Sequence, residues 1–137
     1  MVGKLILVVD DERDIAEIVS ELLQGEGYRT TVAYDGQEAL AALREHRPDA
    51  VVLDIKMPVM DGLEVIHRMR ADPAFQDMPI VVLTATRVIK ELEQEFRQCR
   101  VYHWISKPFE SDELVRSVTN ALLGSDPRGS DPKGLRT

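Results

Sequence analysis

Cysteine, aromatic residues and long apolar runs are all scarce in this sequence. A single cysteine, Cys99, stands among 137 residues, and aromatic residues make up 5% of the chain. A disulfide framework and a cysteine-rich metal site are therefore excluded, and a reducing cytoplasm is the expected compartment. The apolar run near the start, residues 5–9, is far shorter than the about 20 residues of a membrane helix, so we expect no membrane span and no signal peptide.

Positive charge is also in deficit. The chain has 17 Lys and Arg residues against 24 Asp and Glu residues, which gives a formal net charge of −7. Nucleic-acid binding is driven by attraction between positive side chains and the phosphates of the nucleic acid. A negative net charge disfavours that attraction, so we expect no direct nucleic-acid binding by this chain. Hydrophobic residues, at 44%, are frequent enough for the core of one globular domain.

Short apolar runs alternate with segments of helical period along residues 1–123. The predicted strands are residues 5–9, 30–33, 50–53, 80–83 and 101–105. Apolar residues spaced three and four apart follow each of them, which is typical of amphipathic helices, and Ser111 is the expected N-cap of the last helix. Strands that are apolar on both faces indicate a parallel sheet covered by helices on both sides. We therefore predict a single doubly wound α/β domain of five strands and five helices over residues 1–123.

Residues 124–137 differ in composition from the rest. Residues 125–129, Ser-Asp-Pro-Arg-Gly, are nearly repeated as Ser-Asp-Pro-Lys-Gly at residues 130–134, and Leu135 is the one apolar residue in the segment. Such a segment has too little apolar surface to order itself. We predict a disordered tail or a truncated linker.

Acidic residues follow the first and third predicted strands. Asp10, Asp11 and Glu12 come after the first strand, and Asp54 comes after the third. Ligands of parallel sheets bind beyond the carboxyl ends of the strands, so with a strand order of 2-1-3-4-5 these carboxylates would converge on one pocket. Hard oxygen ligands without a thiolate or an imidazole select a hard cation, for which Mg²⁺ is the best candidate.

This donor set indicates phosphoryl transfer. Asp54 is the candidate nucleophile, because it is the lone acid at a strand end, whereas Asp10 and Asp11 form a pair suited to metal binding. Lys107, after the fifth strand, could neutralise the transferred group, and Thr84, after the fourth, could donate a hydrogen bond to it. The backbone carbonyl of Lys56 could complete the metal shell.

Four motifs together resemble the receiver domain of two-component response regulators over residues 4–123. They are Val-Val-Asp-Asp-Glu at residues 8–12, Val-Val-Leu-Asp-Ile-Lys-Met-Pro-Val-Met-Asp-Gly at 51–62, Leu-Thr-Ala at 83–85 and Lys-Pro-Phe at 107–109. The resemblance implies a flavodoxin-like (βα)5 fold of strand order 2-1-3-4-5. It also implies a cis peptide bond between Lys107 and Pro108.

The resemblance further implies a signalling switch. Asp54 would accept a phosphoryl group from a histidine kinase or a phosphotransfer histidine, in a reaction that depends on Mg²⁺. Asp11, Asp54 and the Lys56 carbonyl would hold the ion, assisted by Asp10, while Lys107 and Thr84 would contact the phosphoryl group. The chain would assist its own phosphorylation and dephosphorylation without being an enzyme in the usual sense.

The resemblance assigns the output to one face of the molecule. Thr84 and Trp104, which stands where the family usually has Tyr, Phe or His, would act as the switch pair. The face of the fourth helix, fifth strand and fifth helix would then change its affinity for a downstream effector or for a second copy of the chain, as a homodimer. Lys56 stands where the family tunes the lifetime of the phosphoryl group.

Other functions of the same fold stay open. A degenerate receiver would bind partners without phosphorylation. An aspartyl-phosphate phosphatase would need a second acid two residues past the nucleophile, where Lys56 stands. A flavin carrier would need a phosphate-binding loop after the first strand, where Asp10, Asp11 and Glu12 would repel a phosphate. Cys99 is expected to pack as a small hydrophobic residue.

Overall fold

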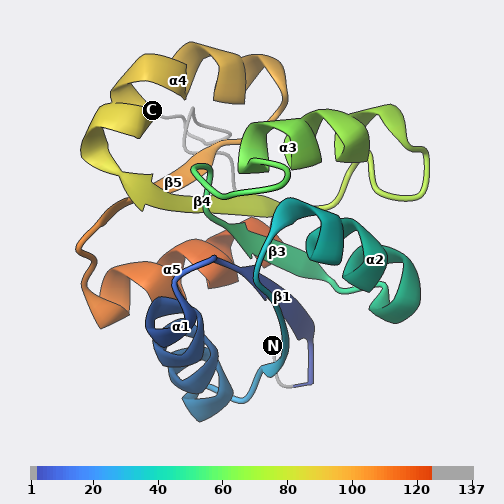
Figure 1. The fold of residues 1–137 in the computed structure, drawn as a ribbon. Coiled ribbons are helices and arrows are strands. Elements are labelled where there is room, and N and C mark those ends of the chain that lie inside the picture. The colour runs from blue at the N-terminus through green and yellow to red at the C-terminus, as the bar shows by residue number, and fades with distance from the viewer. Residues whose placement is uncertain (1–2, 125–137) are drawn as a thin grey trace.

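A computed structural model describes residues 3–124, which form a five-stranded parallel sheet between two layers of helices (Figure 1). The strands are β1 (Leu5–Val9), β2 (Arg29–Ala33), β3 (Ala50–Leu53), β4 (Ile80–Ala85) and β5 (His103–Lys107). The helices are α1 (Arg13–Gly25), α2 (Gly36–His46), α3 (Gly62–Ala71), α4 (Thr86–Gln98) and α5 (Ser111–Leu122). The strand order is β2-β1-β3-β4-β5, which confirms the predicted flavodoxin-like fold.

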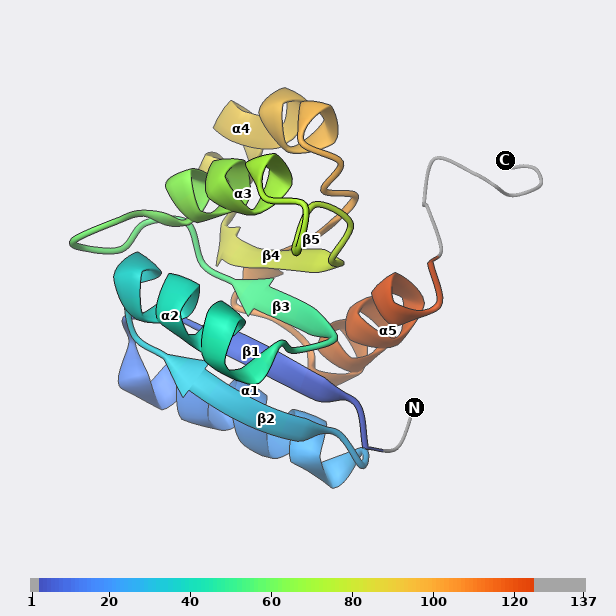
Figure 2. The same cartoon turned by 90° about the vertical axis from the view of Figure 1, so that its right-hand side faces the viewer.

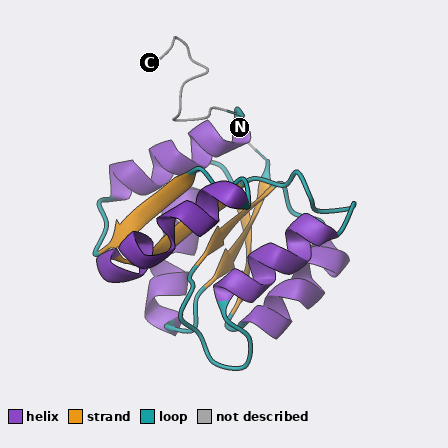
Figure 3. Cartoon of the chain, turned by 90° about the horizontal axis from the view of Figure 1, so that it is seen from above, coloured by secondary structure: helices purple, strands orange, loops and turns teal. Residues whose placement is uncertain are grey.

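Helices α1 and α5 cover one face of the sheet, and α2, α3 and α4 cover the other (Figures 1 and 3). Alternate residues of the buried strands pack into two apolar cores, one on each face of the sheet. Leu7, Val51 and Val82 pack beneath α2–α4, whereas Ile6, Val52 and Val81 pack against α1 and α5. Because a strand between two helical layers has no face in water, both sets are apolar, as the sequence pattern predicts.

The helix ends that face the carboxyl edge of the sheet are held by short local bonds. Asp35 caps α2 by accepting a hydrogen bond from the backbone N–H of Glu38 at 2.8 Å, and Asp61 caps α3 through Glu64 at 3.0 Å. The backbone N–H of Gly36 donates to the carbonyl of Met60 at 3.1 Å, so the first turn of α2 also supports the loop between β3 and α3. These loops adjoin one another at one edge of the sheet (Figure 2).

Predicted boundaries of β2, β4 and β5 and the predicted N-cap of α5 are wrong by one or two residues. Strand β5 begins at His103 instead of residue 101, because the N–H of Val101 donates to the Phe96 carbonyl and closes the end of α4, with Arg100 at φ 60°. Thr84 and Ala85 pair with β5 and so are the last residues of β4. The N-cap of α5 is Glu110, whose carbonyl accepts the N–H of Leu114, so Ser111 is the first helical residue.

Other expectations are confirmed. The Lys107–Pro108 bond is cis, and Cys99 is half-buried against the core beneath α2–α4. Within residues 3–124, none of the helices combines the length and the apolar character needed to cross a bilayer. The predicted tail lies outside the described residues apart from Gly124.

Candidate functional site

The register of the central strands brings Asp10 and Asp54 together. Val9 of β1 is paired with Leu53 of β3, so the residues that follow them leave the sheet side by side. The backbone N–H of Asp54 continues the ladder by donating to the Val9 carbonyl at 3.0 Å. Both acidic residues are buried, with 2% of Asp10 and 5% of Asp54 exposed. Two carboxylates in such a place require a cationic partner.

Lys107, the last residue of the edge strand β5, supplies that partner. Its Nζ lies 2.7 Å from Asp10 Oδ2, 3.0 Å from Glu12 Oε1 and 3.1 Å from Asp54 Oδ2. Ala85 pairs with Lys107 at the end of β5, and this pairing sets the reach of the lysine side chain. One ammonium group therefore faces three carboxylates, and the cluster keeps an excess of negative charge.

The cluster shifts the pKa values of two of its members. Burial raises the pKa of Asp10 to about 6, against the lowering effects of the hydrogen bonds from Lys107 and from the backbone N–H of Glu12. Burial by itself would lower the pKa of Lys107, but the hydrogen bond to Asp10 and the charge of Asp54 outweigh it and raise that pKa. Lys107 is thus held in its charged form, and the carboxylates could accommodate further positive charge.

The two carboxylate oxygens of Asp54 have different partners. Asp54 Oδ1 accepts a hydrogen bond from the backbone N–H of Ile55 at 2.7 Å, whereas Oδ2 faces Lys107. The first residue of α3, Gly62, packs directly on this backbone, because a Cβ at that position would lie 2.1 Å from the Asp54 carbonyl oxygen. Gly62 also donates its N–H to the Ile55 carbonyl at 2.8 Å. A side chain at residue 62 is incompatible with this placement of Asp54.

A cavity of about 370 Å³ opens over these groups. Its lining comes from the loops after β1 and β3, from the ends of β4 and β5, and from the first turn of α4. The lining residues are Asp11, Glu12, Asp54, Lys56, Thr84, Ala85, Arg87, Val88 and Lys107. Thr84 is 2% exposed, and its hydroxyl makes no hydrogen bond to any residue in the described part of the chain.

The cavity gathers most of the predicted site residues and adds two. Asp11, Lys56 and Thr84 line the cavity. Asp10 does not line it but accepts a hydrogen bond from Lys107, which does. Glu12 was expected at this edge of the sheet but was assigned no role in the site, and Arg87 was not predicted. The position of Glu12 directly after Asp10 and Asp11 could have indicated it, whereas no motif indicates Arg87.

Trp104 lies away from this cavity, under α4. Its ring centroid is 6.0 Å from that of Phe96, and the Arg97 guanidinium lies 5.0 Å from its centroid. Arg97 is held in turn by Glu93 at 3.0 Å. Trp104 is half-buried where β5 packs against α4.

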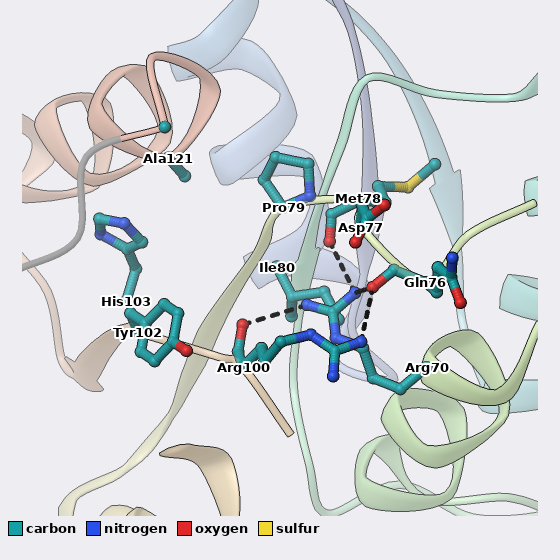
Figure 4. A pocket seen from close by; sticks show the side chains of 11 residues that line it. Arg70, Gln76, Asp77, Met78, Pro79, Ile80, Arg100, Tyr102, His103 and Ala121 are labelled. Carbon is teal, nitrogen blue, oxygen red and sulfur yellow. Dashed lines mark hydrogen bonds between the residues drawn. The ribbon is translucent and has the colours of Figure 1, made fainter. Parts of the chain in front are cut away.

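A second cavity, of about 310 Å³, lies at the opposite edge of the sheet, where β4 and β5 begin (Figure 4). Arg70 dominates it, and burial lowers the pKa of this residue. Its guanidinium donates to five backbone carbonyl groups, those of Cys99, Phe75, Gln76, Met78 and Arg100. Because these carbonyls occupy the guanidinium, we assign Arg70 a structural role: it joins the end of α4 to the loop before β4.

The comparisons with known proteins agree with this geometry. The family described as "Response regulator receiver domain" matches residues 6–119. The DNA-binding response regulator MtrA of Mycobacterium tuberculosis is 42% identical over 125 residues, which are 88% of this chain and 51% of MtrA. The response regulator MprA of Mycobacterium sp. strain KMS is 39% identical over 131 residues, 95% of this chain and 56% of MprA. The chain therefore spans about half the length of the curated relatives that it matches.

Two solved structures are similar over nearly their whole length. The chemotaxis response regulator CheY4 of Vibrio cholerae has a TM-score of 0.80 and 33% identity, covering 87% of this chain and 98% of CheY4. The receiver domain of NtrX from Brucella abortus has a TM-score of 0.80 and 34% identity, covering 88% of this chain and 99% of that domain.

Proposed function

Since the chain belongs to the response regulator receiver domain family, we propose that it is a signalling switch controlled by phosphorylation of Asp54. The observation that carries the proposal is the contact of Lys107 Nζ with Asp10, Glu12 and Asp54 at the carboxyl edge of the sheet. This cluster gives a buried carboxylate nucleophile, a fixed cation for the transferred group and an acidic surround for a metal ion. The phosphoryl donor is a phosphohistidine of a histidine kinase or of a phosphotransfer protein.

The proposed reaction begins with attack of Asp54 on the phosphorus atom. We assign the attack on phosphorus to Asp54 Oδ2, which faces the Lys107 ammonium group, whereas Oδ1 accepts the Ile55 N–H. The bond from oxygen to phosphorus forms as the bond from phosphorus to the donor's imidazole nitrogen breaks, and the electron pair of the broken bond stays on that nitrogen. Lys107 stays charged and stabilises the phosphoryl oxygens, and the Thr84 hydroxyl donates to one of them.

The donor set fits Mg²⁺. The carboxylate oxygens of Asp10, Glu12 and Asp54 lie within 4.8 Å of one another, and no thiolate or imidazole lies in the cavity lining. We assign the ion to Asp10, Asp11, Asp54 and the Lys56 backbone carbonyl, with Glu12 as a further carboxylate beside them. Bound there, Mg²⁺ would supply the positive charge that offsets the phosphoryl oxygens.

An apolar groove beside the acidic cavity suits the donor protein. It is about 490 Å³ in volume and lies between α1 and the loop before α5, with Glu12 and Lys107 shared between groove and cavity. Ile18, one of its lining residues, is 47% exposed. We assign this groove to a helix of the donor that carries the phosphohistidine. An Ile18→Ser variant should slow transfer from a phosphohistidine protein and leave phosphorylation by acetyl phosphate unchanged; slowing of both would contradict the assignment.

The output belongs to α4, β5 and α5. Phosphorylation gives the buried Thr84 hydroxyl its acceptor, and the accompanying shift of the first turn of α4 alters the contacts of Trp104. The altered face would bind an effector protein, an effector domain or a second copy of the chain. MtrA is named a DNA-binding response regulator, so a DNA-binding effector on a longer chain is one such output. Exchange with kinases and effectors makes the cytoplasm the working compartment.

Acetyl phosphate tests this function directly. The intact mass of the wild-type chain and of Asp54→Asn is measured after incubation with acetyl phosphate, with and without Mg²⁺. The proposal expects one phosphoryl adduct on the wild type, only with Mg²⁺, and none on the variant. A folded wild-type chain that forms no adduct would instead be a degenerate receiver.

A further inference from the structure

Arg87 lines the cavity over Asp54, but the chemistry described so far gives it no role. It lies in the first turn of α4, and it is the charged lining residue that this helix contributes. The other charged lining residues come from the loops after β1 and β3 and from β5. An interaction of Arg87 with a group on Asp54 would therefore link the reacting centre directly to α4, with no other residue between them.

No counter-charge holds Arg87 in the described part of the chain. It is exposed and makes no ion pair or side-chain hydrogen bond with any residue there. Arg97, on the same helix, is instead paired with Glu93 and lies over Trp104. The first turn of α4 also has no acidic residue, and its N-cap, Ala85, provides no side-chain acceptor. Because the positive end of a helix favours anions, a cation in this turn is unfavourable unless an anion joins it.

A buried hydroxyl in the same lining independently indicates an anion. Thr84 is 2% exposed and lines the cavity, and its hydroxyl has no hydrogen-bond partner among the residues of the described chain. A buried hydroxyl without a hydrogen-bond partner destabilises the fold, which indicates that its partner is a group that binds in the cavity. Thr84 and Arg87 lie three residues apart at the junction of β4 and α4, and both face a space that would hold the phosphoryl group.

Building on the proposed phosphorylation of Asp54, we propose that Arg87 binds the phosphoryl oxygens through its guanidinium group. The planar guanidinium can donate two parallel hydrogen bonds to a phosphoryl group, and each is strengthened by charge. Arg87 then acts twice. It attracts anionic phosphoryl donors into the cavity, and it covers the phosphoryl group of Asp54 against attack by water.

Three variants test this role: Arg87→Ala, Arg87→Lys and, as a matched control, Lys90→Ala. Lys90 is an exposed cation of the same helix that does not line the cavity. Phosphorylation is followed by intact mass over a range of acetyl phosphate concentrations with Mg²⁺, and the adduct's decay is followed after the donor is removed. Trp104 emission is recorded in parallel, and urea unfolding shows whether each variant is folded.

From the strength of charge-assisted hydrogen bonds at an exposed site, Arg87→Ala should raise the half-saturating donor concentration and shorten the adduct half-life, each by about fivefold. It should also reduce the Trp104 response at full phosphorylation. Arg87→Lys should restore part of each effect, and Lys90→Ala should match the wild type.

Two results would overturn the inference, and they differ in what else they overturn. If folded Arg87→Ala forms the adduct and loses it at wild-type rates, Arg87 has no role and the proposed function stands. If the wild type itself forms no adduct, the proposed function falls together with the role of Arg87.

Discussion

Replacing Gly62 with alanine should damage both stability and phosphorylation, because Gly62 sets the position of Asp54. A Cβ at residue 62 would lie 2.1 Å from the Asp54 carbonyl oxygen, 2.9 Å from Ile55 Cα and 3.0 Å from the Asp54 carbonyl carbon. All three neighbours are backbone atoms, so no side chain can move aside. Helix α3 and the end of β3 must separate by about 1 Å to restore ordinary contact distances.

The size of the effect follows from this separation. Overpacking of a tight contact costs about 1–3 kcal/mol, and the displaced backbone also weakens the Gly62–Ile55 hydrogen bond, so we expect Gly62→Ala to lose about 2–3 kcal/mol of unfolding free energy. A misplacement of about 1 Å at a reacting group can slow a reaction about 100-fold, so the phosphorylation rate should fall by at least about tenfold.

Urea unfolding and the initial rate of adduct formation from acetyl phosphate measure the two effects. Gly25→Ala is the matched control, since Gly25 ends α1 and a Cβ there meets nothing within 4 Å. It should leave the phosphorylation rate unchanged and keep or slightly raise stability. A Gly62→Ala variant as stable and as reactive as the wild type would refute the reasoning.

Three further predictions concern residues outside the cavity over Asp54. Val59 is 74% exposed and β-branched at φ 71°, so Val59→Asn should raise the unfolding free energy in urea by about 1 kcal/mol; an unchanged or lower value would show that the loop is not strained. Arg70 donates to five carbonyl groups, so Arg70→Met should cost about 3 kcal/mol in the same assay and Arg70→Lys should recover less than half of it; near-neutral variants would contradict its structural role. Burial raises the pKa of the Cys99 thiol, so a disulfide reagent at pH 8 should label it more slowly in the folded chain than in urea, and equal rates would contradict its burial.

The fold was predictable because each strand carries its own evidence. Residues 50–53 and 80–83 are apolar on both faces, and only a sheet between two helical layers buries both faces. The end of α4 was less predictable. Val101 is fully buried, as a strand residue would be, but its N–H donates to the Phe96 carbonyl and closes the helix. Periodicity alone does not separate these two roles.

The site was predictable to the extent that it lies on strand ends. Asp10, Asp54 and Lys107 follow or end buried strands, so their meeting at one edge follows from the topology. The contact of Glu12 with Lys107 depends on side-chain reach, and the exposure of Arg87 to the cavity depends on where α4 begins. No motif in the sequence indicates Arg87. Trp104 was predicted as a switch residue from family position, and that role stays a prediction.

Reductive trapping of the adduct tests the central claim most directly. Borohydride converts an acyl phosphate of aspartate to homoserine, and fragment masses of the digested chain identify the residue that changed. After treatment with acetyl phosphate and Mg²⁺, the account predicts homoserine at residue 54 and at no other aspartate, with none in a sample lacking Mg²⁺. Homoserine at Asp10 or Asp11, or an adduct that resists reduction, would contradict it.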